Sequence, residues 1–139
     1  MTPSQNGSIS RRGLSDRYKQ AEKETSRLIL EANLLKSSGR RKESAQKFVQ
    51  AADLEMKNCD ELLARGLLDN YQIHRFSAAS CLAQAGNLYQ AMQICSELLE
   101  NFELAAPLHR RITGYLDVLE TRLDQWMTSY VLDAVAAAD

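Results

Sequence analysis

Two histidines and three cysteines are the residue types in this sequence that could act as bases, nucleophiles or soft metal ligands. His74 and Cys81 are seven positions apart in one helical pattern, which separates them by roughly 10 Å along a helix axis. A cysteine nucleophile needs its histidine within hydrogen-bond distance, so this pair is too far apart to form a dyad. No H-x-x-x-H, C-x-x-C or E-x-x-H spacing occurs, and no phosphate-binding glycine loop or G-x-S-x-G turn. We therefore expect no catalysis, no metal site and no other cofactor.

The three cysteines, Cys59, Cys81 and Cys95, are odd in number and lie inside apolar helical patterns. In such positions cysteine behaves as a small core hydrophobe, so no disulfide framework is expected. The sequence begins without the apolar stretch of a secretory signal, and no apolar run is long enough for a membrane span. We expect a cytoplasmic protein that does not insert into a membrane.

Charge is unevenly distributed along the 139 residues. Residues 1–47 carry eleven Lys/Arg and five Asp/Glu, whereas residues 48–139 carry six and thirteen. A basic half can indicate nucleic-acid binding, but here lysines and glutamates alternate, as in Lys19, Glu22, Lys23 and Glu24. This interleaving favours solvated helix faces, so we expect no nucleic-acid partner.

Glycine and proline are scarce, six and two in all, and they divide the chain into helical segments. Residues 1–14 are polar and aperiodic, which predicts a flexible tail. Apolar periodicity predicts helices over about 15–37, 41–65, 68–85, 88–101 and 107–136, with Ser15 and Asn87 as N-caps. Gly39, Gly66 and Gly86 end the first three helices. The fold class is therefore all-α.

Two of these breaks lie in matching surroundings. "EANLLKSSGRRKESAQKFVQAA" (31–52) and "AASCLAQAGNLYQAMQICSELL" (78–99) each place a small residue seven positions before the glycine and another five after it. These small residues are Ala32 and Ser44 in the first segment, and Ala79 and Ala91 in the second. Small residues let two helices approach closely, so each segment predicts an antiparallel helical hairpin.

The pattern resembles the tetratricopeptide repeat, in divergent form. The resemblance implies one domain, 15–139, built as a right-handed stack of hairpins: the first over about 15–65, the second over about 68–101, then a helix over about 107–136. The sequence departs from the family at Cys95, which replaces an aromatic residue, and in the 47-residue separation of the two glycines, where the family period is about 34. The microtubule-interacting-and-trafficking domain resembles the first unit but leaves the second copy unexplained.

The resemblance also implies a groove lined by the first helix of each hairpin, and hence non-catalytic binding of a protein or peptide by an adaptor, chaperone-like protein or assembly subunit. Ile29 and Ile73 stand where carboxylate-binding members carry polar groups, which favours an amphipathic or extended peptide. The residues that map to this groove are Ile29, Asn33, Lys36, Ser37, Ile73, Phe76, Ser77, Ser80 and Gln84.

The last helix carries an apolar seam with steps of three and four: Ile112, Leu116, Leu119, Leu123, Trp126 and Tyr130. At roughly 45 Å it is much longer than the fourth helix, at roughly 20 Å, so its end must overhang or pair with something else. Trp126, Met127 and Tyr130 are a candidate interface, because such residues are enriched in interface cores. The alternative is that the second helix covers them. The second function hypothesis is a structural protein that forms a homodimer through this helix.

Overall fold

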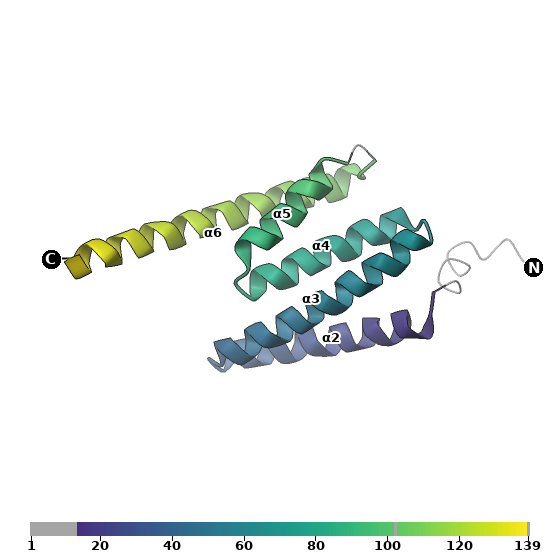
Figure 1. Cartoon of the computed structure of the whole chain (residues 1–139), viewed down its shortest axis with the longest axis horizontal. Coiled ribbons are helices and arrows are strands. Elements are labelled where there is room, and N and C mark those ends of the chain that lie inside the picture. Colours follow the sequence, from purple (N-terminus) through teal and green to yellow (C-terminus); the bar gives the residue numbers. More distant parts are fainter. Residues whose placement is uncertain (1–13, 102, 139) are drawn as a thin grey trace, which may run out of the picture.

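The computed structural model describes residues 14–101 and 103–138, and the regular elements in these ranges are helices (Figure 1). Five helices occur in these ranges, and each packs against the next as an antiparallel neighbour. They are α2 (Asp16–Ser37), α3 (Arg41–Ala64), α4 (Leu68–Gln84), α5 (Leu88–Leu99) and α6 (Ala106–Ala138). The expected all-α class is confirmed, and every observed helix end lies within two residues of the expected one.

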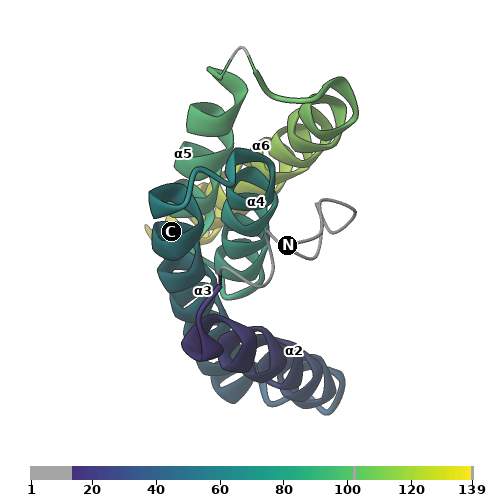
Figure 2. The same ribbon diagram turned by 90° about the vertical axis from the view of Figure 1, so that its right-hand side faces the viewer.

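The helices form two layers. Figure 2 shows α3 and α5 on one side and α2, α4 and α6 on the other. Because neighbours in the chain are antiparallel, α2, α4 and α6 all run in the same direction (Figure 1). α2 and α6 are the two ends of this row.

Helix α2 begins at a side-chain cap, as its sequence predicts. Ser15 Oγ accepts a hydrogen bond from the Tyr18 N–H. The same residue binds α3, since its N–H and hydroxyl donate to the Glu61 carboxylate at 2.7 and 2.6 Å. These bonds, with one from Arg17, lower the pKa of Glu61. Leu14, the last residue of the expected tail, is buried against Tyr18 and Leu62; the rest of that tail lies outside the described residues.

Glycine ends the first three helices because the backbone there turns left-handed. At Gly86 φ is +94°. The Gly86 N–H donates to the Ala83 carbonyl, and the following N–H, of Asn87, donates to that of Leu82. This pair of bonds is the Schellman motif, which satisfies the last carbonyls of α4. Asn87 was expected to cap α5 with its side chain. That expectation is wrong, since Asn87 occupies the N-cap position without a side-chain cap bond.

Replacing Gly86 with alanine should lower the free energy of unfolding by about 1 kcal/mol, because a β-carbon is strained at positive φ. The matched control is Gly114, an exposed glycine inside α6 whose added β-carbon would meet nothing within 4 Å. Alanine at Gly114 should instead raise stability by about 0.5–1 kcal/mol. Urea unfolding of both variants measures the two effects. A shift of the same sign in both would contradict the assigned conformation.

One hydrophobic core runs through all five helices. The small residues of the two matched segments lie in it: Ala32, Ala79 and Ala91 are fully buried. Ser44 is also buried, and its hydroxyl donates to the Ala32 carbonyl at 2.7 Å, directly from α3 to α2. All four small residues are therefore buried, and in the first pair the direct bond shows the close approach of α2 and α3 that the spacing predicts.

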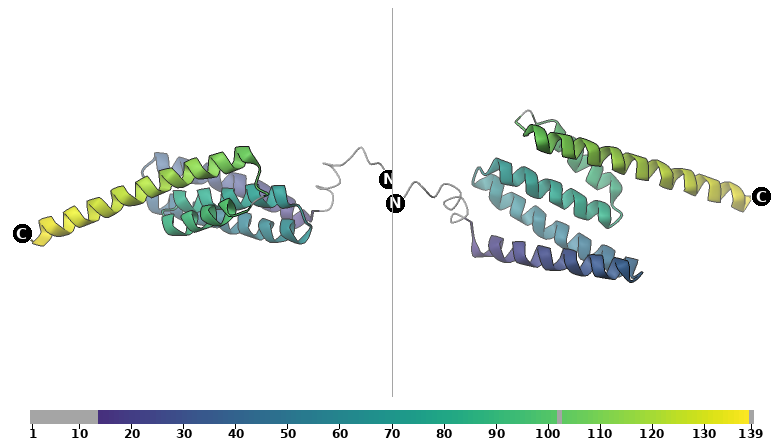
Figure 3. Two further views of the ribbon diagram at one scale, coloured as in Figure 1. Left: turned by 90° about the horizontal axis from the view of Figure 1, so that it is seen from above. Right: turned by 180° about the vertical axis from the view of Figure 1, so that it is seen from behind.

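The last helix extends well beyond the body (Figure 3). α6 has 33 residues and α5 has 12, which correspond to lengths of about 50 and 18 Å. Only Ile112 and Leu119 of α6 are buried. The seam therefore packs through its first half and is then left exposed. No helix among the described residues is long and apolar enough to cross a membrane.

Candidate functional site

A groove of about 450 Å³ lies between α4 and α6. Four residues that the sequence assigns to a partner groove line it together on α4, namely Ile73, Phe76, Ser77 and Ser80. They recur at helical spacing, which places them on one face. The facing wall comes from α6 and consists of Leu108, Arg111 and Tyr115.

Aromatic contacts join the two walls. The rings of Phe76 and Tyr115 meet edge to face, with centroids 5.5 Å apart. The Arg111 guanidinium lies 5.9 Å from the centroid of the Phe76 ring, in cation–π distance. No ion pair among the described residues involves Arg111, whose side chain is exposed. The groove thus combines apolar and aromatic side chains, two serine hydroxyls and one arginine that has no ion-pair partner among the described residues.

The groove residues expected on α2 are arranged differently. Lys36 reaches α4, where its Nζ donates to Gln84 Oε1 at 3.0 Å. Ile29 is half-buried and packs against the core, so little of it is offered to a partner. Asn33 and Ser37 are exposed. Of the expected set, four α4 residues form the hollow with α6, and the bond from Lys36 to Gln84 joins α2 to α4 within the same layer.

Sequence reasoning missed the α6 wall. Leu108, Arg111 and Tyr115 recur with steps of three and four, the same signal that predicted the seam, but on an adjacent face of the helix. The seam is longer than this stripe and wholly apolar. A second stripe that contains an arginine carries no such signature.

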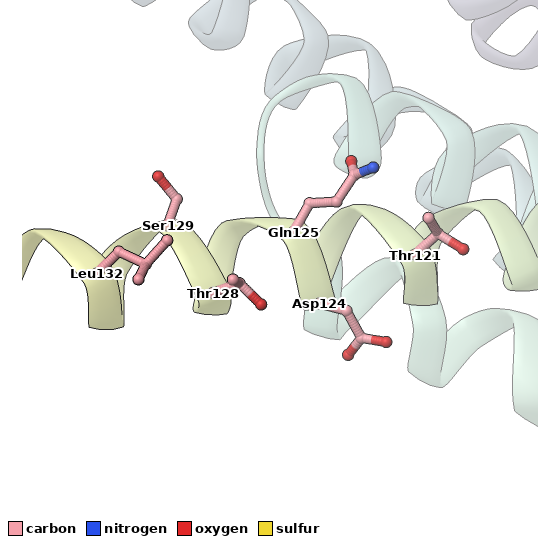
Figure 4. A pocket seen from close by; sticks show the side chains of 6 residues that line it. All are labelled: Thr121, Asp124, Gln125, Thr128, Ser129 and Leu132. Atoms are coloured by element: carbon pink, nitrogen blue, oxygen red, sulfur yellow. The ribbon is translucent and has the colours of Figure 1, made fainter.

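The candidate interface of Trp126, Met127 and Tyr130 is exposed on the overhanging half of α6, between 43% and 62% for each side chain. The alternative that the second helix covers these residues is therefore wrong. Trp126 and Tyr130 stack on each other with centroids 5.7 Å apart. The hollow beside them is lined by α6 residues alone (Figure 4). It is a depression on one helix and lacks the facing wall that a binding cavity needs.

A partly buried polar cluster links α2, α3 and α4. His74 of α4 lies between Glu55 of α3, with Nδ1 3.0 Å from Oε1, and Tyr18 of α2, with Nε2 2.9 Å from the hydroxyl. The Glu22 carboxylate lies 3.9 Å from the same Nε2. The hydrogen bond to Glu55 raises the pKa of His74 above its usual value of 6.5. Tyr18 and Glu55 are 2% and 5% exposed, whereas the His74 and Glu22 side chains are 17% and 30% exposed, so the cluster joins three helices beneath a partly exposed edge.

The cysteines lie in the core, as expected. Burial raises the thiol pKa of Cys59 and Cys81 to about 12 and that of Cys95 to about 11. These thiols are therefore protonated at neutral pH, and the reactive thiolate is disfavoured. Among the described residues, no three His, Cys, Asp or Glu side chains are grouped closely enough to hold a metal ion.

Comparison with known proteins does not identify a relative. No protein-family model, curated protein or solved structure matches this chain. Its function is therefore inferred from its own residues and their geometry.

Proposed function

We propose that this chain is a non-catalytic protein-binding module that holds a peptide in the groove between α4 and α6. The observation that carries the proposal is the Arg111 guanidinium, without an ion-pair partner among the described residues, beside the apolar surface of Ile73, Phe76 and Leu108. An arginine in such a place forms strong, directional hydrogen bonds with a carboxylate. The ligand would therefore be an amphipathic or extended segment with an acidic residue next to an apolar one.

The proposal includes a divergent architecture of the tetratricopeptide type. Three features support it: the matched glycine breaks, the parallel direction of α2, α4 and α6, and side-chain links within that layer from Lys36 to Gln84 and from Phe76 to Tyr115. In such stacks the first helix of each unit lines the binding surface, and α6 would be the first helix of an incomplete third unit. An adaptor or assembly subunit in the cytoplasm is the role that fits this surface.

Peptide selection from a random displayed library tests the groove directly. The wild-type protein should enrich peptides that share an acidic and an apolar position. Arg111→Glu should weaken their binding by about tenfold or more, since a charge-assisted bond is replaced by repulsion. Arg110→Glu is the matched control, because it makes the same charge change at an exposed neighbouring residue that does not line the groove. Equal binding by both variants, or selection of no shared motif, would refute the proposal.

Self-association through α6 is the second candidate function. The observation that favours it is the concentration of exposed apolar side chains on the overhang, which are Trp126, Met127, Tyr130, Val131, Leu132 and Val135. At these exposures the six side chains offer roughly 600 Å² per chain, spread around the helix, so one partner helix would cover part of this area. Exposed apolar side chains concentrated on one free stretch of helix indicate an interaction site.

A further inference from the structure

We infer that the overhang of α6 in one copy packs in parallel against the outer face of α2 in a second copy, so that copies associate head to tail. The inference specifies the partner surface for self-association and is independent of peptide binding in the groove. It rests on a match of charge and residue spacing between the two end helices of the row, which lie far apart in one molecule (Figures 1 and 2).

The outer face of α2 is basic at its beginning and apolar at its end. One line of side chains runs along the side of α2 opposite the buried Ala21, Leu28 and Ala32. This line consists of Lys19, Lys23, Leu30 and Leu34. Both lysines are exposed, and neither takes part in an ion pair among the described residues. Leu30 and Leu34 are each 62% exposed. An end helix that presents two leucines in this way resembles an inner helix that has lost its neighbour, since terminal units of stacked helices normally have a polar outer face.

The free flank of α6 has the complementary pattern. One line of side chains runs along α6, rotated about a third of a turn around the helix axis from the buried Ile112 and Leu119. This line consists of Glu120, Asp124, Val131 and Val135. Both carboxylates are exposed and lie outside the ion pairs of the described residues. Val131 and Val135 are more than half exposed. Residues 123–138, which follow Arg122, contain no basic residue.

The two lines have the same spacing, with steps of four, seven and four residues. In a parallel pairing at one constant offset, Lys19 falls opposite Glu120 and Lys23 opposite Asp124. Leu30 then falls opposite Val131, and Leu34 opposite Val135. An antiparallel pairing would instead set the carboxylates against the leucines. Parallel is also the direction in which α2, α4 and α6 already run within one chain (Figure 1), so the contact continues the existing row.

Such an interface is heterologous, because it joins two different surfaces. It leaves a free α2 face at one end of a dimer and a free α6 overhang at the other, so further copies can add. A dimer in which two α6 overhangs pair with each other would instead close at two copies. The two arrangements therefore predict different behaviour when variants are mixed.

The test uses two variants of the full chain, each blocked on one face. The α2 variant is Lys23→Glu with Leu34→Glu, and the α6 variant is Val131→Glu with Val135→Glu. All four residues are exposed, so circular dichroism should report unchanged helix content. By sedimentation velocity, the wild type should form oligomers that grow with concentration and weaken with added salt. Each variant alone should be monomeric, and an equimolar mixture should form a one-to-one dimer.

Gln46→Glu with Gln50→Glu is the matched control, because it adds two carboxylates on the exposed side of α3. It should associate like the wild type. If the α2 variant alone still dimerises while the α6 variant does not, the overhangs pair with each other; self-association would then hold and the head-to-tail contact would be wrong. A wild type that remains monomeric throughout would overturn both.

Discussion

Replacing Leu119 with alanine is expected to lower the free energy of unfolding by about 3 kcal/mol. Leu119 is fully buried and, with Ile112, is one of two buried residues on α6. The loss combines the transfer free energy of the removed methyl groups with the cavity that remains. Because so few side chains anchor α6, we expect its backbone amides to lose protection before those of α2 and α3.

Urea unfolding and hydrogen exchange measure these two effects. Val118→Ala is the matched control, since Val118 is the preceding residue and is 52% exposed; its stability should change by less than about 0.5 kcal/mol. Peptides selected on the groove should bind the Leu119 variant poorly, because α6 forms one wall of that groove. A loss of stability below about 1 kcal/mol would mean that α6 is held by contacts other than this residue.

The second large effect is expected from Glu55, the buried carboxylate beside His74. Replacing Glu55 with glutamine should lower the free energy of unfolding at pH 6 by about 2 kcal/mol, since a hydrogen bond to a charged group becomes a neutral one. The control is Glu97→Gln, which removes the half-exposed glutamate that pairs with Arg75. That control should lose less than about 1 kcal/mol.

His74 should also make stability depend on pH. Its pKa is raised in the folded state above 6.5, so protonated His74 favours folding. This contribution is fully present below pH 6.5 and is lost as the pH rises through the folded-state pKa. Groups facing the imidazole are Glu55 from α3, and Glu22 and the Tyr18 hydroxyl from α2. Unfolding measured from pH 6 to 8, below the ionisation of unfolded thiols, should show the decline in the wild type and a flatter curve in Glu55→Gln. A wild-type curve that rises over this range would show that His74 is not stabilised in its charged form.

Short sequence patterns are enough to predict most of the helical fold. The positive φ that Gly39 and Gly86 adopt and the burial of Ala32 and Ala79 follow from patterns a few residues long. Five helices and their ends could therefore be predicted from the sequence. Asn87 shows the limit, since a residue typical of N-caps occupies the position without making the bond.

The site could be predicted only in part, because it depends on residues far apart in the chain. The α4 wall follows from one helix, but its pairing with Tyr115 requires knowing how α6 crosses α4. The partners of His74 come from Tyr18 and Glu55, 56 and 19 positions away, and no spacing rule connects them. Whether Trp126 is covered likewise depends on where α6 ends relative to the body, which periodicity does not specify.

Each helix packs mainly on the helices before and after it in the chain. The chain loses little conformational entropy when contacts form between segments close in sequence. Helical proteins built from such contacts fold within microseconds to milliseconds. All residues of the α2–α3 hairpin have been synthesised once the chain reaches position 64. Later helices can then pack onto the hairpin in order. We therefore expect folding to begin on the ribosome, from the N-terminal hairpin onward, ahead of the end of translation.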